Sequence, residues 1–131
     1  HFYIGESART NREGIAQMVE ILEKYGYTGS AVPLKKVLHL KTGVNYLDND
    51  TMLVSGEFVG RPEFAQFRQV IVPEEEAYAS NCLYINGKVI VPEGFPVVEK
   101  AVRDLGYPVI LVDTSEFRKI DGGLSCLSLR F

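Results

Sequence analysis

The chain has 131 residues, enough for one ordinary domain, and its 46% hydrophobic and 24% charged residues are typical of a folded globular protein. The net charge is −3 and no basic stripe runs along the sequence, which argues against a nucleic-acid partner. No apolar run approaches the roughly 20 residues of a membrane span, so no membrane partner is expected either.

Only two cysteines occur, Cys82 and Cys126. So few thiols do not form a disulfide or metal framework, and they fit a reducing compartment, which predicts a cytoplasmic protein. The first residues, from His1 onward, are apolar without a preceding linker. Because domain boundaries usually fall in polar or flexible segments, we expect this chain to be a piece of a longer one. The alternative is that tag or leader residues have been removed from its start.

The first 34 residues predict a strand, a helix and a second strand. The strands are expected at Phe2 to Ile4 and at Ser30 to Leu34. Thr10 and Glu13 have the spacing of a capping box, and Gly26 can end the helix in a left-handed conformation. The apolar residues of the helix recur at helical spacing: Ile15, Met18, Val19, Leu22 and Tyr25.

The remaining chain twice shows the order strand, strand, helix, strand. The first set is expected at Val37 to Leu40 with Val44 to Leu47, Thr51 to Ser55, a short helix from Pro62, and Val70 to Val72. The second set is expected at Cys82 to Ile85, Lys88 to Val91, a helix from Pro96 closed by Gly106, and Val109 to Val112. Asn86-Gly87 suits the tight turn of a hairpin, whereas Glu74 to Glu76 indicate a solvated loop.

The two sets recur at a period of roughly 40 residues, which is typical of propeller or solenoid arrays. They predict an α/β fold with modules at about 37–78 and 79–116, flanked by partial modules at 1–36 and 117–131. His39 then begins one module, Asn81 the next and Gly123 a third. In a circular array such positions converge on the axis, which would bring His39 to Cys126 although they are 87 residues apart (126 − 39).

Cys126 follows Gly122-Gly123 at the start of a short strand-like run. An ionised thiol is a nucleophile, and a distant histidine can serve as its acid and base. The plainer alternative is that a free cysteine in an apolar strand is buried and inert, which is how we interpret Cys82. His39 lies between leucines, and such a histidine on an apolar strand is more often structural.

Two charged residues lie in predicted loops, which are frequent locations of binding residues. Arg9 falls between the first strand and the helix, and an arginine there can bind a carboxylate bidentately. Asp121 precedes the double glycine and can pair with a cation. The alternatives are a solvated surface arginine and an ordinary turn residue.

Four segments together resemble one family, the bacterial dimethylarginine dimethylaminohydrolases. They are Phe2–Asn11, His39–Thr42, Asn81–Asn86 and Ile120–Cys126. The resemblance covers this whole chain but only the C-terminal half of the family's enzyme. It implies about half of a five-bladed α/β propeller built from ββαβ modules, the guanidine-modifying or pentein fold.

The resemblance implies hydrolysis of Nω-methylated arginine to citrulline and a methylamine through a covalent thiouronium intermediate. Cys126 corresponds to the nucleophile and His39 to the acid and base. Arg9 corresponds to the residue that holds the substrate α-carboxylate, Asp121 lies beside the guanidinium, and the carbonyl of Ile120 is a further contact. No metal and no organic cofactor is implied.

Alternatives remain within the same fold. An arginine or agmatine deiminase is one of them. The related arginine deiminases usually carry an aspartate two residues after the histidine, and Lys41 at that place favours the dimethylarginine-hydrolysing branch. A non-catalytic binding or assembly module is the other alternative, which the Cys126 and His39 pair disfavours. The family's other guanidinium-binding carboxylates lie in its N-terminal half. We therefore expect the chain to be inactive alone and to require that half as its partner, with a homodimer left open.

Overall fold

The structure is a computed structural model that describes residues 1–129 and has a mixed α/β architecture. The chain forms two compact units, His1–Leu40 and Lys41–Phe131. The strands are β1 (Phe2–Glu6), β2 (Gly29–Pro33), β3 (Val44–Tyr46), β4 (Thr51–Val54), β5 (Arg68–Ile71), β6 (Leu83–Ile85), β7 (Lys88–Pro92) and β8 (Val109–Val112). The α-helices are α1 (Arg12–Lys24), α2 (Pro96–Asp104) and α3 (Ser115–Arg118).

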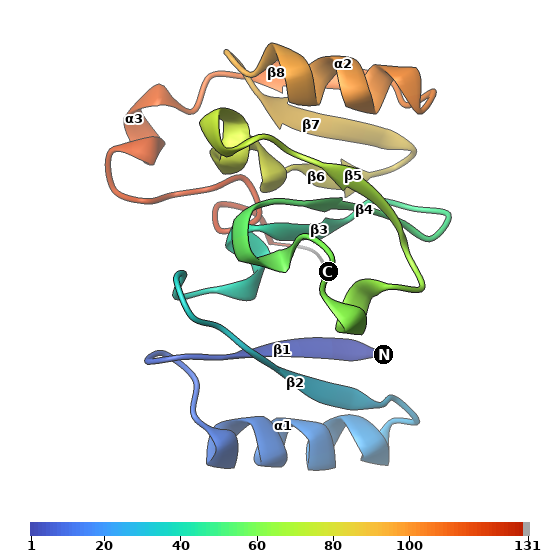
Figure 1. Ribbon diagram of the computed structural model, residues 1–131, viewed down its shortest axis with the longest axis vertical. Coiled ribbons are helices and arrows are strands. Elements are labelled where there is room, and N and C mark those ends of the chain that lie inside the picture. The colour runs from blue at the N-terminus through green and yellow to red at the C-terminus, as the bar shows by residue number, and fades with distance from the viewer. Residues whose placement is uncertain (130–131) are drawn as a thin grey trace. The chain divides into compact units, whose positions relative to one another are not determined.

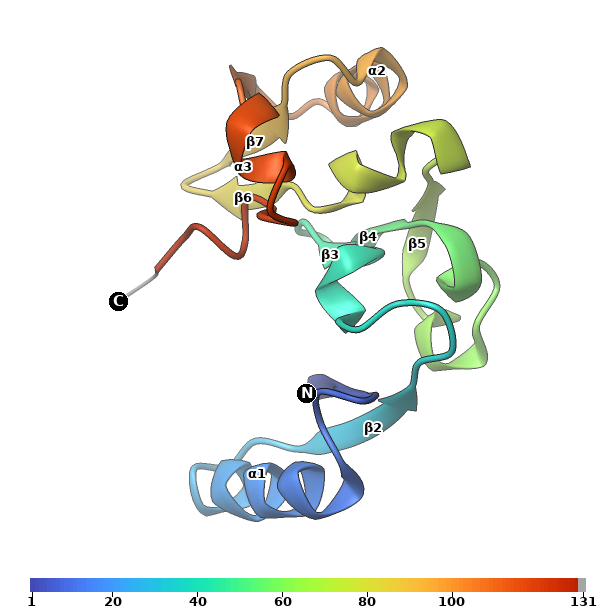
Figure 2. The ribbon, with the colours of Figure 1, turned by 90° about the vertical axis from the view of Figure 1, so that its left-hand side faces the viewer.

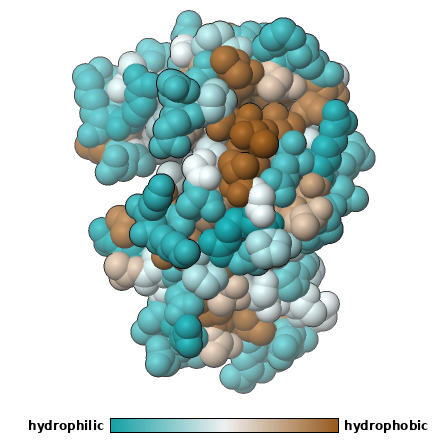
Figure 3. Space-filling view, viewed as in Figure 1, coloured by the Kyte–Doolittle hydropathy of each residue, from teal (hydrophilic) through white to brown (hydrophobic). Residues whose placement is uncertain are grey.

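The first unit is a βαβ arrangement, as the sequence predicts. β1 and β2 pair in parallel, in a register that runs from Phe2 with Gly29 to Glu6 with Pro33. α1 covers one face of this pair of strands in both ribbon views (Figures 1 and 2). The space-filling view shows hydrophilic residues on the outer side of α1 and apolar ones between the helix and the strands (Figure 3).

Two details of α1 differ from the sequence prediction. The helix is capped by Asn11, whose side chain accepts the Gly14 N–H at 2.9 Å, and not by Thr10 in a capping box. Thr10 cannot cap because its backbone already pairs with Ser7 in a turn. The buried face carries Ile15 and Leu22, whereas Met18 and Tyr25, predicted on the apolar stripe, are exposed.

The second unit holds two sheets with the same pairing pattern. In the order β3-β4-β5, the first pair is antiparallel and the second parallel, and β6-β7-β8 repeats this. The connection from β7 to β8 is the helix α2, as predicted from Pro96. The connection from β4 to β5 contains only single 3-10 turns, Gly56–Phe58 and Pro62–Phe64. The repeat of pairing follows the predicted modules, while their boundaries and the five-bladed propeller stay predictions.

The hairpin of β6 and β7 is the one that the sequence predicts. Asn86 and Gly87 have φ values of +50° and +71°, the left-handed conformations that a two-residue type I′ turn requires. Leu83 pairs with Ile90 and Ile85 with Lys88. At the other end of the sheet, β8 occupies Val109–Val112, the predicted range.

A single apolar core joins both sheets of the second unit and α2. Its fully buried members include Cys82, whose thiol donates a hydrogen bond to the Ala79 carbonyl at 2.9 Å. The prediction that Cys82 fills the core is therefore confirmed. The core consists of Leu47, Leu53, Val72, Ala79, Cys82, Val89, Val91, Phe95, Val98 and Val102.

The prediction of a solvated loop at Glu74 to Glu76 is wrong. Residues Glu74–Ser80 form a 3-10 helix, and Glu76 is buried within it. Its carboxylate accepts the backbone N–H groups of Val97 at 3.1 Å and Val98 at 2.8 Å, in the first turn of α2. A carboxylate can be buried there because free N–H groups and the helix dipole compensate its charge. None of the helices within residues 1–129 has the length and apolar character of a membrane span.

Candidate active site

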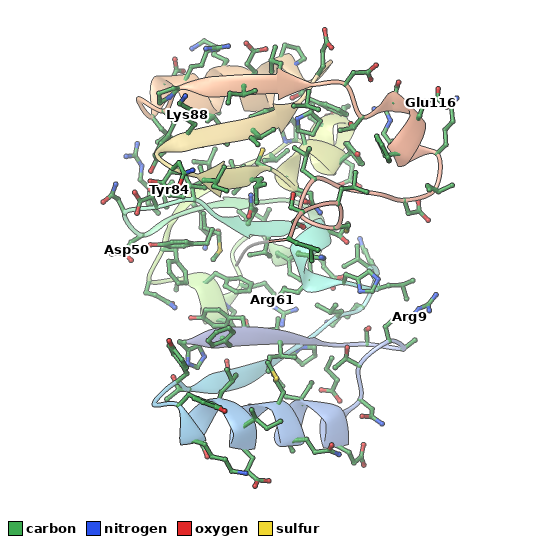
Figure 4. All side chains as sticks on the ribbon, turned by 180° about the vertical axis from the view of Figure 1, so that it is seen from behind. Arg9, Asp50, Arg61, Tyr84, Lys88 and Glu116 are labelled. Carbon is green, nitrogen blue, oxygen red and sulfur yellow. The ribbon has the colours of Figure 1, made fainter. Side chains whose placement is uncertain are left out.

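Arg9 lies in a tight turn that directly follows β1. Ser7 and Thr10 pair through two backbone hydrogen bonds of 3.0 and 3.3 Å, and the Arg9 N–H donates to the Ser7 hydroxyl at 3.1 Å. The Arg9 side chain is exposed and extends outward from this turn (Figure 4). The guanidinium is thus available to a ligand while its backbone is fixed.

His39 lies in an irregular segment and not on the strand that was predicted at Val37 to Leu40. The residues after β2 form bends that lead into a 3-10 turn at Leu40–Thr42, and His39 directly precedes it. The Leu38 carbonyl accepts the Ser7 hydroxyl, a contact that helps to hold this segment in its irregular conformation. The His39 side chain is exposed, unlike that of a core histidine.

Ser7 connects the segments that carry Arg9 and His39. Its hydroxyl donates to the Leu38 carbonyl at 2.8 Å while accepting the N–H of Arg9. Next to this bond, a Cβ on Gly5 would lie 3.2 Å from the Cβ of Leu40, so the segment after His39 packs closely on β1. The first unit therefore holds the backbone on both sides of His39 against the end of β1.

Cys126 lies in a turn rather than in the predicted strand-like run. Its N–H donates to the Gly123 carbonyl at 2.9 Å, and the Leu127 N–H donates to the same oxygen at 3.1 Å. These local bonds close a helical turn, which replaces strand pairing for the segment. The Cys126 side chain is exposed.

Two side chains from the end of the 3-10 helix at Glu74–Ser80 hold this turn. Asn81 accepts the Ser125 N–H through Oδ1 at 2.9 Å, and Tyr78 donates its hydroxyl hydrogen to the Gly122 carbonyl at 2.7 Å. Both contacts span 44 residues of sequence. No local pattern marks either residue, so the sequence does not predict these roles.

Asp121 and Ile120 lie just before this turn, after α3. Asp121 adopts a left-handed backbone with φ of +61°, as its turn interpretation requires, and its side chain is exposed. Ile120 is 80% exposed. Arg118, at the end of α3, stacks on the rings of Tyr78 and Phe95 at 5.5 Å from each centroid. Through this contact α3 packs on Tyr78, the residue that also holds the Cys126 turn.

The two cysteines have opposite environments. Burial raises the pKa of the Cys82 thiol to about 12, so this thiol stays protonated near neutral pH. Cys126 is exposed and is the thiol that a ligand can reach. Within residues 1–129, no three His, Cys, Asp or Glu side chains are grouped to hold a metal ion. Arg9 and His39 belong to the first unit and the other candidates to the second, so the meeting of His39 with Cys126 stays a prediction.

No model of a known protein family matches this chain. Among characterised relatives, the dimethylarginine dimethylaminohydrolase of Pseudomonas aeruginosa is 60% identical over 131 residues, which is 100% of this chain and 52% of the relative. The enzyme of the same name from Streptomyces coelicolor is 33% identical over 128 residues, which is 98% of this chain and 49% of the relative. The chain thus spans about half the length of the curated relatives it matches.

Solved structures agree with these relatives. The Pseudomonas aeruginosa enzyme, with a cysteine replaced by serine and citrulline bound, superposes with a TM-score of 0.96 at 59% identity over 98% of this chain and 51% of that chain. A dimethylarginine dimethylaminohydrolase with a histidine replaced by glycine, as an adduct with S-methyl-L-thiocitrulline, has the same score and coverage. An amidinotransferase from Microseira wollei, 21% identical over 97% of this chain and 43% of its own, has a TM-score of 0.84 and shares the fold alone.

These findings place the chain among proteins with the α/β fold of the guanidine-modifying enzymes. Over its whole length it is a homologue of dimethylarginine dimethylaminohydrolase, of which it corresponds to about half. The resemblance found in its four sequence segments is thereby confirmed.

Proposed function

We propose that this chain supplies the cysteine and histidine of a hydrolase that converts Nω-methylated arginine to citrulline and a methylamine. The observation that carries the proposal is 60% identity across the full chain to an enzyme of that name. The related structures that contain citrulline and S-methyl-L-thiocitrulline support a ligand with an arginine-like skeleton. The exposed Cys126 and His39 are the side chains in this chain suited to that chemistry.

The reaction would proceed through a covalent intermediate, which divides one difficult step into two. The Cys126 thiolate attacks the guanidinium carbon and forms a C–S bond. His39 donates a proton to the methylamine as the C–N bond breaks, which leaves a thiouronium on Cys126. His39 then takes a proton from water, the resulting hydroxide adds to the same carbon, and the C–S bond breaks to give citrulline and the free thiol.

The spacing of the two residues supports this assignment. The cysteine and the histidine replaced in the two related structures are 87 positions apart in the numbering of those chains. His39 and Cys126 have the same separation in this sequence (126 − 39 = 87). An alignment that covers all 131 residues is consistent with equal spacing.

The remaining proposed contacts concern substrate binding. Arg9 would hold the substrate α-carboxylate through its exposed guanidinium, since arginine binds carboxylates in a bidentate manner. Asp121 and the Ile120 carbonyl would lie beside the substrate guanidinium. A bound cation near Cys126 favours the thiolate, so substrate binding would itself promote the nucleophile.

We further propose that activity requires the half of the enzyme that this chain does not span. A decisive test is a chimera in which this chain replaces the matching part of the Pseudomonas aeruginosa relative. The chimera is expected to release citrulline from dimethylarginine, whereas the chain alone is not. Replacing Cys126 by serine or His39 by glycine in the chimera should reduce turnover by a factor of roughly 10³ or more.

Substrate comparison and thiol labelling supply the controls. Faster turnover of arginine or agmatine than of dimethylarginine by the chimera would instead identify a deiminase. A 2-chloroacetamidine label that modifies Cys126 and Cys82 equally would contradict the nucleophile assignment. A chimera that folds, shown by its circular dichroism, but hydrolyses none of these guanidines would support a non-catalytic module.

A further inference from the structure

We propose that Asn81 is a positioning residue for Cys126, an inference that rests on the proposed function of that thiol. Asn81 does not contact the reacting atoms in this role. Instead, its side chain fixes the turn from Gly123 to Cys126, so that the thiol is held at one place and the segment cannot extend into the strand that its sequence favours.

The first argument is the hydrogen bond from the Ser125 N–H to Asn81 Oδ1, at 2.9 Å. Ser125 directly precedes Cys126, so the bond restrains the peptide that carries the nucleophile. The backbone hydrogen bonds within the turn come from the N–H groups of Cys126 and Leu127 and leave the Ser125 N–H to Asn81. Loss of this acceptor would leave a part-buried donor without its partner, which is the costly way to lose a hydrogen bond.

The second argument is the close packing of Asn81 on Gly123. A Cβ on Gly123 would lie 2.6 Å from Nδ2 and 2.8 Å from Cγ of Asn81, which is closer than real Cβ atoms approach. Gly123 is itself buried. The glycine is therefore needed for the approach of the amide and not for a left-handed backbone, because no positive φ occurs there.

The third argument is that Asn81 is anchored in the core. Its N–H donates to the Tyr78 carbonyl at 3.2 Å, and the next residue, Cys82, is fully buried. The Cys82 carbonyl in turn accepts a hydrogen bond from the Asn45 amide at 2.8 Å, which links this segment to β3. A side chain based on so rigid a backbone can hold the turn, whereas one on a mobile loop could not.

Tyr78 also restrains this turn, because its hydroxyl donates a hydrogen bond to the Gly122 carbonyl. Gly122, Gly123 and Ser125 are thus each fixed by the segment that ends at Asn81. Cys126 itself is exposed, so its place depends on these neighbours. A misplacement of about 1 Å at a reacting group can cost on the order of 10²-fold in rate, so this hold is expected to matter for turnover.

The test compares Asn81→Ala, Asn81→Asp and the control Gln69→Ala. Gln69→Ala also removes a part-buried amide, one that donates to the Phe64 carbonyl at 3.0 Å away from Cys126. In the chimera, Asn81→Ala should lower kcat for dimethylarginine by roughly 10- to 100-fold while KM changes less than about threefold. Asn81→Asp retains an acceptor for the Ser125 N–H, so it should recover most of the kcat that Asn81→Ala loses.

Amide hydrogen exchange of Ser125 in the full 131-residue chain is the measurement that does not depend on activity. It should accelerate at least about tenfold in Asn81→Ala and stay unchanged in Gln69→Ala. Iodoacetamide labelling of Cys82 should remain absent in every variant, which shows that the core is intact. A kcat loss that appears only together with Cys82 labelling would overturn the proposal as a folding effect.

The outcomes also separate this proposal from the proposed function. Unchanged Ser125 exchange and unchanged kcat in Asn81→Ala would overturn the positioning role while the enzyme assignment stands. A chimera that is inactive with every guanidine would overturn the proposed function and, with it, the catalytic consequence of Asn81. Faster Ser125 exchange in Asn81→Ala would then show that Asn81 stabilises the turn without contributing to catalysis.

Discussion

The carboxylate of Glu76 accepts two consecutive backbone N–H groups, those of Val97 and Val98, 3.1 and 2.8 Å away at the start of α2. The residue at the N-cap position of this helix, Phe95, provides no side-chain cap. Glu76 therefore supplies from 21 and 22 residues upstream what the helix lacks locally. This connection ties the 3-10 helix that leads to Asn81 to the largest helix of the second unit.

Replacing Glu76 by alanine should destabilise the second unit. Two N–H groups in the first turn of α2 lose their acceptor, so the free energy of unfolding should fall by about 1–2 kcal/mol. Glu76→Gln retains one acceptor oxygen, so its free energy of unfolding should lie between those of the wild type and Glu76→Ala. Urea denaturation measures the effect, and Glu75→Ala is the matched control because Glu75 is exposed. Equal stability of the Glu76→Ala and Glu75→Ala variants would contradict the capping role.

Cys82 should make the stability depend on pH above neutrality. Its pKa is raised by burial to about 12 in the folded state, against an ordinary value of about 8.5 in the unfolded chain. Between these values only the unfolded state releases the proton, so rising pH favours unfolding. The contribution of Cys82 is fully present below about pH 8.5 and is lost as the pH approaches 12.

The comparison of wild type with Cys82→Ala isolates this effect from other titrating groups. The difference between their free energies of unfolding should shrink as the pH rises from 8 to 10, by at most about 1.4 kcal/mol per pH unit. Urea denaturation at several pH values is the measurement. Parallel stability curves for the two proteins would show that the thiol is not buried in the folded state.

Gly123→Ala should disturb the Cys126 turn through Asn81. The added methyl group would stand 2.6 Å from Nδ2, so either the amide or the turn must move. We expect the free energy of local opening at the Ser125 amide to fall by about 1–3 kcal/mol, measured by hydrogen exchange. The double variant Asn81→Ala, Gly123→Ala removes the clash, so the two effects should not add. Additivity within about 0.5 kcal/mol would refute the contact.

Ser80→Ala should leave stability unchanged or raise it slightly, by up to about 1 kcal/mol. Ser80 is fully buried, and its Oγ has no hydrogen-bond partner among residues 1–129. Removing a buried hydroxyl that makes no bond removes a desolvation cost. Tyr84→Phe is the contrasting variant, because its hydroxyl donates to Asp48 at 2.7 Å, and it should lower stability. Clear destabilisation by Ser80→Ala would reveal a partner for that hydroxyl.

Elements fixed by local chemistry could be predicted from the sequence. Asn86-Gly87 selects its hairpin turn through backbone conformation alone, and the apolar runs on either side of it determine both strands. Pro96 and Gly106 delimit α2 through similarly local preferences, with Gly106 at φ +90°. The βαβ order of the first unit follows from the same kind of signal.

Features that depend on distant contacts could not be predicted. Glu76 follows two other glutamates in a pattern typical of a solvated loop, and only the position of α2 makes its burial favourable. Residues 126–129 have the composition of a strand, but Cys126 and Leu127 donate their N–H groups to the Gly123 carbonyl and close a turn instead. The sequence indicates Cys126 as the candidate nucleophile, yet Asn81, which holds the neighbouring Ser125, lies 44 residues before Ser125.

Tyr78 and Asn81, whose side chains hold the Cys126 turn, both precede it in the sequence. Chains are synthesised from the N-terminus and their domains fold in that order, so Asn81 and the strands that anchor it are made before Ser125 exists. The turn can then fold onto a template that is already packed, at the small additional entropy cost of closing one loop. The Cys126 thiol is consequently expected to become ordered after the core segment that holds its turn.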